Sequence, residues 1–120
     1  MHPKTLARRL AKITLEKKAS NVKIFDLRPL TNVTDFFVVC SADSEVQVKA
    51  ICDHLSETMS KKAMKPWHVE GLEKRQWVLL DFVDVVVHIF LPEVREFYGL
   101  ERLWGDAEIE EIVDVHEPKT

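Results

Sequence analysis

The sequence predicts an α/β fold, a single domain with a mixed five-stranded sheet and flanking helices. A chain of 120 residues that is 46% hydrophobic and 31% charged fits one compact soluble domain with one core. Short runs rich in β-forming residues alternate with stretches whose apolar residues recur at helical spacing. The strand–helix–strand passage over residues 36–70 favours at least one parallel pair of strands, because such pairs need a long crossover.

The first expected helix covers Lys4 to Lys18, where Leu6, Leu10 and Ile13 recur at helical spacing. This stretch is basic, as organelle transit peptides are, but its apolar stripe favours a native helix. A strand is expected from Val22 to Arg28.

The run from Phe36 to Cys40 is apolar throughout, which predicts a central strand buried on both faces. A second helix begins near Ser44, since Ser44 and Gln47 have capping-box spacing. It ends before Pro66, and residues 67–70 follow as a short strand.

The stretch from Trp77 to Phe90 is expected to form two strands around a polar break at residues 81–84. Pro92 opens a last helical segment, which Gly99 interrupts. Beyond Gly105 the chain is expected to form a short helix, an edge strand or a disordered tail. The predicted division is therefore a domain over residues 1–107 and an acidic tail over residues 108–120.

Charge and cysteine content restrict the function. Residues 106–120 hold six acids and one base, so the rest of the chain is close to neutral. This balance argues against tight or sequence-specific nucleic-acid binding, which needs Lys and Arg residues clustered along one face. Cys40 and Cys52 lack ligand spacing, so we expect free buried thiols, a cytoplasmic location and no metal or other cofactor. No apolar run is long enough to span a membrane.

The Trp77–Phe90 ribbon divides into two faces if a two-residue turn joins its strands. One face is wholly aliphatic: Val78, Leu80, Val85, Val87 and Ile89. The other combines apolar bodies with polar tips: Trp77, Leu79, Asp81, Val86, His88 and Phe90. A three-residue loop would change this parity. The second face is covered by the chain itself, by a second copy or by another protein, and its aromatic residues are typical of an interaction site.

A search for catalytic groups finds little. Asp81 and Asp84 form a pair of carboxylates that could hold Mg²⁺, but Asp-x-x-Asp is also a common polar turn. No Gly-rich phosphate loop and no nucleophile–base pair is present. An enzyme that uses Asp81 and Asp84 to hold Mg²⁺ for phosphoryl transfer and a plain homodimerisation module therefore remain as alternatives to a binding protein without enzymatic activity.

Four segments in order resemble the ribosomal silencing factors, also called the Iojap or YbeB family. They are TDFFVVCSADS, HVEG, WVLLDFVDVVVHIF and REFYGLERLWGDA. The resemblance implies a nucleotidyltransferase-like fold without activity, and the enzyme alternative becomes a minimal nucleotidyltransferase using Asp81 and Asp84. It further implies binding to large-subunit ribosomal protein fourteen. Docked there, the protein blocks joining of the small and large subunits and represses translation when nutrients are short.

The resemblance also implies contact residues. Trp77, His88, Phe90, Tyr98 and Trp104 match aromatic and histidine positions of the family motifs, and Leu79 lies on the same face of the ribbon. The same face is expected to support a homodimer when the protein is free. Two positions depart from the family pattern, because Val83 and Ala42 stand where the family has Gly. Since Val resists positive φ, the turn at Val83 is expected to be longer or of another type.

Overall fold

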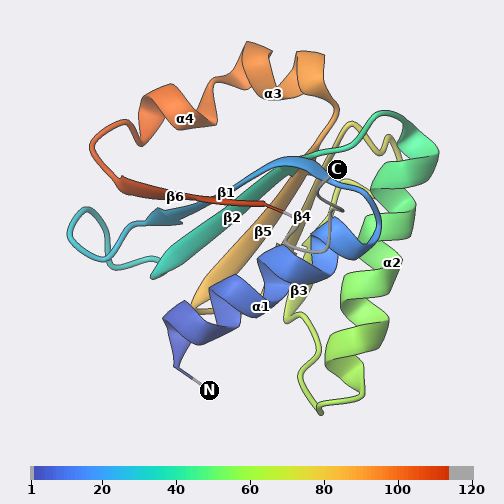
Figure 1. Ribbon diagram of the computed structural model, residues 1–120, viewed down its shortest axis with the longest axis horizontal. Helices are drawn as coiled ribbons and strands as arrows, with labels where there is room; N and C mark the ends of the chain where they lie inside the picture. Colours follow the sequence, from blue (N-terminus) through green and yellow to red (C-terminus); the bar gives the residue numbers. More distant parts are fainter. Residues whose placement is uncertain (1, 114–120) are drawn as a thin grey trace, which may run out of the picture.

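The computed structural model describes residues 2–113, in which helices pack on both faces of one sheet (Figure 1). The elements in chain order are α1 (Pro3–Glu16), β1 (Ser20–Asp26), β2 (Phe36–Ser41), α2 (Glu45–Ser60), β3 (His68–Glu70), β4 (Trp77–Asp81), β5 (Val85–Phe90), α3 (Pro92–Tyr98), α4 (Leu100–Leu103) and β6 (Glu108–Ile112). Among these described helices, none is both long and apolar enough to cross a membrane.

The predicted α/β class is confirmed, but the predicted number of strands is wrong. The sheet has six strands in the order β3-β4-β5-β2-β1-β6. Its parallel pair joins β2 to β5, and the other neighbours are antiparallel. The strand after α2 is therefore not the parallel partner of β2, because β3 pairs at the far edge with β4.

The additional strand, β6, comes from the segment beyond Gly105. Its residues pair with β1 from Val22↔Ile112 to Asp26↔Glu108. The first residues of the predicted acidic tail thus belong to the sheet, as the edge-strand alternative expects. Arg8 of α1 also bonds Glu110 at 3.2 Å, which ties β6 to the first helix. Residues 114–120 of the predicted tail lie outside the described part of the chain.

Helices α1 and α2 cover the aliphatic face of the sheet (Figure 1). The predicted stripe of α1 is buried there, with Leu10 fully enclosed. The Ser44 hydroxyl caps α2 by accepting from Gln47 N at 3.1 Å. The Gln47 side chain reaches back, where its Oε1 accepts from Asp43 N at 2.6 Å and its Nε2 donates to the Lys17 and Lys18 carbonyls. Gln47 therefore also fastens the α1–β1 connection to the start of α2.

The ribbon formed by β4 and β5 has the predicted parity. Trp77 lies opposite Phe90, and Asp81 lies opposite Val86. All five aliphatic residues of the first face belong to the main core: Val78, Leu80, Val85, Val87 and Ile89. The turn between Phe82 and Val85 contains two residues, so the expectation of a longer turn is wrong.

Val83 occupies this turn with φ +75°, a conformation unusual for a β-branched residue. Asp84 N donates to Phe82 O at 3.0 Å, the one-residue bridge of a γ-turn. Two side chains hold the strained residue in place: Asp81 Oδ1 accepts from Val83 N at 2.7 Å, and Thr34 donates to Val83 O at 3.2 Å. Local hydrogen bonds therefore offset the cost of the valine.

Replacing Val83 by Gly is expected to raise the free energy of unfolding by about 1 kcal/mol. Glycine relieves strain of about 1–3 kcal/mol at positive φ, partly offset by its greater freedom in the unfolded chain. Val83 is 59% exposed, so little packing is lost. Urea unfolding of the wild type and the Val83→Gly variant measures the difference. An unchanged or lower midpoint would show that the valine conformation is not strained.

Candidate functional site

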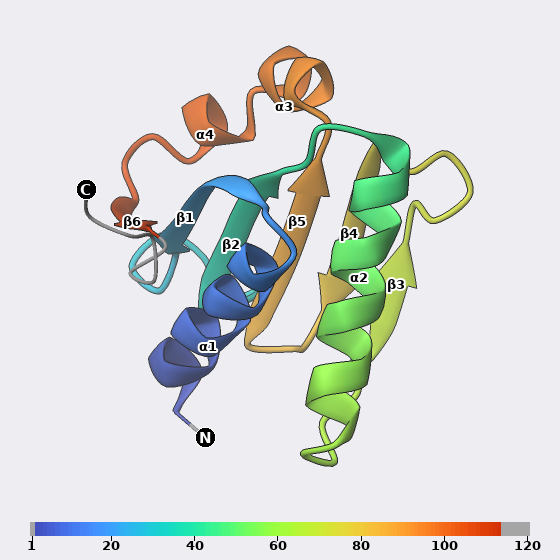
Figure 2. The same cartoon turned by 45° about the vertical axis from the view of Figure 1, so that its right-hand side comes forward.

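The second face of the sheet is only partly covered by the chain. Helices α3 and α4 pass over one end of it, on the side opposite α1 and α2 (Figures 1 and 2). Beneath them lies a small second core: Phe25, Leu27, Val39, Phe90 and Ala107. Trp77, Phe37 and Trp104 pack against this core at its margin and remain half-buried. The surface bordered by α3–α4, the β3–β4 loop and the loop at residues 27–34 is called the open face below.

Trp77 is the centre of the aromatic residues on the open face. Its indole stacks on Phe90, with ring centroids 4.9 Å apart, and Tyr98 of α3 lies at the same distance from it. Indole Nε1 donates to Nδ1 of His88 at 3.0 Å. This bond makes Nδ1 an acceptor and therefore assigns the ring proton of neutral His88 to Nε2. The orientation of Trp77 is thus fixed by two residues of β5.

His88 supports this arrangement from within the protein. It is 3% exposed, and burial lowers its pKa to about 3. Its Nε2 atom has no hydrogen-bond partner among the described residues. The Phe37 ring lies against the imidazole in an edge-on arrangement, with centroids 4.5 Å apart. His88 is therefore neutral throughout the physiological pH range and serves as an acceptor for Trp77.

Burial of His88 predicts a loss of stability in acid. Its folded-state pKa of about 3 lies below the unfolded value of 6.5, so the unfolded state binds the extra proton. Stability should fall as the pH drops below 6.5, by up to about 1.4 kcal/mol per pH unit. Urea unfolding between pH 7 and 4.5 measures this slope, and His88→Leu is the control. The free energy of unfolding of the control should depend less steeply on pH, by the uptake of up to about one proton on unfolding. Equal slopes for the two proteins would contradict a buried, neutral His88.

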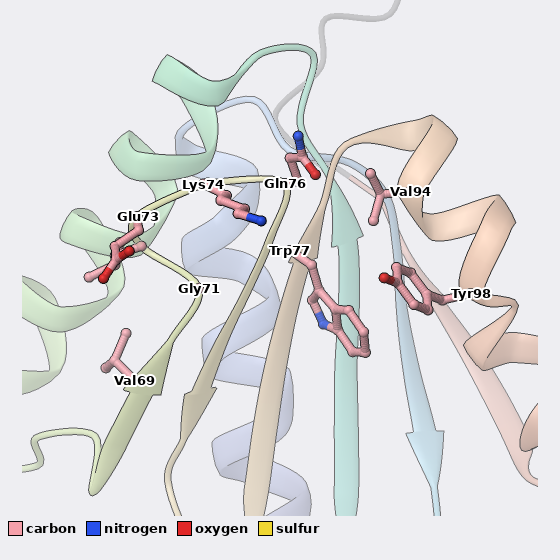
Figure 3. Close-up of a pocket in the computed structure, with 9 residues that line it drawn as sticks. Val69, Gly71, Glu73, Lys74, Gln76, Trp77, Val94 and Tyr98 are labelled. Atoms are coloured by element: carbon pink, nitrogen blue, oxygen red, sulfur yellow. The ribbon is translucent and has the colours of Figure 1, made fainter.

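Two hollows flank Trp77. The first, with a volume of about 510 Å³, lies between the β3–β4 loop and α3. Figure 3 shows the Trp77 and Tyr98 rings side by side in it, with the Lys74 side chain extending from the loop. The second, of about 340 Å³, lies lower on the open face, with His88, Phe37, Leu79 and Trp104 among its lining residues. The bond from Trp77 to His88 joins the two hollows.

The six predicted contact residues lie together around the open face but differ in accessibility. Tyr98 is 56% exposed, whereas Phe90 is fully buried. Trp77, Leu79 and Trp104 are half-buried and line the hollows, and His88 lies beneath them. Their role in docking stays a prediction. Because Phe90 and His88 are buried, they can affect a partner only indirectly, through the residues that cover them.

Two residues that hold this site together were not identified from the sequence. Phe37 contacts both His88 and Trp104, with its ring 6.0 Å from the Trp104 ring. It was placed only within a strand buried on both faces, and no sequence signal separated it from Phe36. The other residue is Arg95, 6% exposed on α3. The sequence signal that could have identified Arg95 is its place as a basic residue on the inner side of the last helical segment.

Arg95 fastens α3 and α4 to the sheet. Its Nη1 donates to Asn21 O at 2.8 Å and to Ser41 Oγ at 2.9 Å, while Nε lies 2.6 Å from Glu101 Oε1. Lys23 bonds the other oxygen of Glu101 at 3.2 Å. Burial acts to raise the pKa of Glu101, but the hydrogen bonds and charges of Arg95 and Lys23 outweigh it and lower the pKa. The position of Tyr98 and Trp104 therefore depends on a charge network behind them.

Of the two candidate catalytic carboxylates, that of Asp81 has a structural role. Asp81 caps the turn through its bond to Val83 N, and the Asp84 carbonyl accepts from Asp35 N at 3.0 Å. Within residues 2–113, no three His, Cys, Asp or Glu side chains are grouped to hold a metal ion. Cys40 and Cys52 are free and buried, as predicted, and burial raises their pKa values to about 12 and about 11.

Fold and site together define a small α/β protein with a partly uncovered aromatic face. Over residues 1–120 the chain matches the family described as "Ribosomal silencing factor during starvation". It is 39% identical to the ribosomal silencing factor RsfS of Halalkalibacterium halodurans over 83% of this chain and 86% of that protein. A crystal structure of a Chromobacterium violaceum protein superposes with a TM-score of 0.85, at 30% identity and 98% coverage of both chains.

A mouse protein named "Mitochondrial assembly of ribosomal large subunit protein 1" is 31% identical over 79% of this chain, which covers 43% of that protein. The chain belongs to the ribosomal silencing factor family, as the sequence resemblance predicts. That family is named for a regulatory role at the ribosome.

Proposed function

We propose that this protein binds the large ribosomal subunit through its open face and blocks joining of the small subunit. Large-subunit ribosomal protein fourteen is the proposed direct partner, and repression of translation during nutrient shortage is the outcome. The mechanism is occlusion, without a chemical reaction. Family membership supports the ribosomal role, and the name of the mouse relative associates one member with the large subunit.

The observation that supports this surface most strongly is the incomplete cover of the second sheet face. The aliphatic face is closed by two helices of 14 and 16 residues, whereas α3 and α4 have only 7 and 4. Trp77, Tyr98 and Trp104 therefore keep accessible area beside two hollows. Aromatic side chains next to pockets are typical anchors of protein interfaces, because they bury a large area at a small entropic cost.

In this proposal Trp77, Leu79, Tyr98 and Trp104 contact the partner directly. His88 fixes the indole of Trp77, and Phe90 supports it from below. A rigid anchor loses less conformational entropy on binding than a mobile one, so these two buried residues contribute to affinity without touching the partner.

Cosedimentation of the wild-type protein with purified large subunits tests the proposal, with small subunits as the comparison. We expect pelleting with large subunits only, and saturation at one copy per subunit. Isolated ribosomal protein fourteen should compete for the bound protein. Failure to pellet with large subunits would exclude the proposed function. A free protein that is dimeric and dissociates on binding would place the homodimer on the same face.

A further inference from the structure

The loop between α2 and β3 carries a basic and aromatic surface outside the open face. Residues 61–67 contain three lysines and no acid: Lys61, Lys62 and Lys65. All three are exposed, and none takes part in the ion pairs formed within residues 2–113. The loop lies at the end of the molecule away from α3 and α4 (Figure 2). We refer to residues 61–67 as the lysine–tryptophan loop.

Trp67 ends this loop and is 79% exposed. The other two tryptophans of the chain are half-buried on the open face. Tryptophan is highly buried on average, so an isolated indole in solvent beside three lysines calls for a binding partner. Next to it is a hollow of about 580 Å³, which Lys61, Lys65 and Pro66 help to line.

The backbone of the loop is held in place although its side chains are free. Lys62 N and Met64 N both donate to Met59 O, at 3.0 and 2.9 Å, and Ala63 between them has φ +58°. The Met64 side chain packs against the main core. At the other end, Trp67 N donates to Asp81 O at 2.7 Å. Lysines and indole are therefore displayed from a pinned backbone, which lowers the entropic cost of binding.

We infer that the lysine–tryptophan loop contacts RNA, with its lysines on backbone phosphates and Trp67 stacked on an unpaired base. Exposed aromatic rings beside clustered lysines are the combination by which proteins hold single-stranded RNA. The inference rests on the proposed function, because docking on the large subunit is what brings ribosomal RNA near the loop. An acidic protein would satisfy the lysines but offers no planar base for the indole.

The contact is auxiliary and independent of RNA sequence. Glu57 and Glu70 flank the loop, and Glu70 is paired with His68 at 2.6 Å, so the positive surface is small. The chain as a whole carries −3, which opposes tight binding to free RNA. The open face supplies most of the affinity, and the loop adds to it only where RNA and ribosomal protein lie side by side.

Two variants test the inference by binding to purified large subunits at several salt concentrations. Trp67→Ala should weaken binding about tenfold, from the loss of one stacked base. The triple variant Lys61→Ala, Lys62→Ala, Lys65→Ala should weaken binding and lower the salt slope by about 2, since each phosphate contact contributes about 0.7–0.9. The matched control removes three cations of α1 and its C-cap that are also outside the described ion pairs, as Arg9→Ala, Lys12→Ala, Lys17→Ala.

All substituted side chains are exposed, so thermal unfolding should show that each variant folds as the wild type does. Binding of the same variants to isolated ribosomal protein fourteen should be unchanged. Equal weakening there would assign the loop to the protein partner and overturn the inference. Unchanged affinity and salt slope on large subunits would overturn it too, while leaving the proposed function intact. Only failure of the wild type to bind large subunits would count against the proposed function itself.

Discussion

Replacing Trp77 and Trp104 together by alanine is expected to abolish binding to the large ribosomal subunit while the protein stays folded. Both indoles lie on the open face, and each lines one of its hollows. Truncation of an aromatic anchor at the centre of an interface costs about 2–4 kcal/mol. Two such losses correspond to a weakening of at least about a hundredfold.

The fold should survive because both residues are half-buried and lie outside the main core. We expect a loss of about 2–4 kcal/mol in the free energy of unfolding, within the usual 5–15 kcal/mol of a small domain. Tyr98→Ala separates docking from stability, since Tyr98 is 56% exposed and should lose affinity with little change in melting temperature. Val46→Ala, at an exposed position of α2, is the negative control. Wild-type affinity of the folded double variant would rule out the open face as the docking surface.

Among single substitutions, removal of the Arg95 guanidinium is expected to lower the free energy of unfolding most. In Arg95→Met, the Asn21 carbonyl and the Ser41 hydroxyl lose their donor, and the Glu101 carboxylate keeps only Lys23. Breaking a buried pair costs about 3–5 kcal/mol; because Glu101 is one-third exposed, we expect about 2–3 kcal/mol. Helices α3 and α4 should loosen, and affinity for large subunits should fall with them.

The matched control is Arg102→Ala, seven residues further along the chain in α4. Arg102 is exposed and takes no part in the ion pairs of residues 2–113, although its guanidinium lies over Gly99. Urea unfolding should show a markedly lower midpoint for Arg95→Met and little change for Arg102→Ala. Hydrogen exchange should localise the loss to residues 92–104. Equal midpoints for the two variants would contradict the role given to Arg95.

Local patterning was sufficient to predict the ribbon and the first face of the sheet. Alternation along β4 and β5 separates Val78 from Trp77 and Ile89 from Phe90, and pairing across a two-residue turn fixes which residues share a face. The expectation of a longer turn at Val83 failed because intrinsic φ preference was outweighed by tertiary bonds. The strained conformation of Val83 is held by the nearby Asp81 carboxylate and by the hydroxyl of Thr34, which is 49 residues away in the sequence.

Tertiary contacts determine the features that the sequence could not predict. Alternation in β6 was too weak to choose between helix, strand and disorder, and its pairing with β1 depends on residues about 90 positions away. Likewise the apolar run at Phe36 and Phe37 carries no sign of which ring faces the helices. The short helices α3 and α4 cover Phe90, whereas Tyr98 at the end of α3 stays exposed. Two residues that both belong to the family motifs therefore differ in burial.

Joining of ribosomal subunits in the presence of the protein tests the central claim most directly. Purified large subunits are first saturated with the wild type, then mixed with small subunits, and the joined fraction is measured by sedimentation. We predict a fall in joined ribosomes in proportion to the bound protein, and normal joining with the Trp77→Ala, Trp104→Ala variant. A wild-type protein that stays bound to large subunits while small subunits join normally would contradict occlusion.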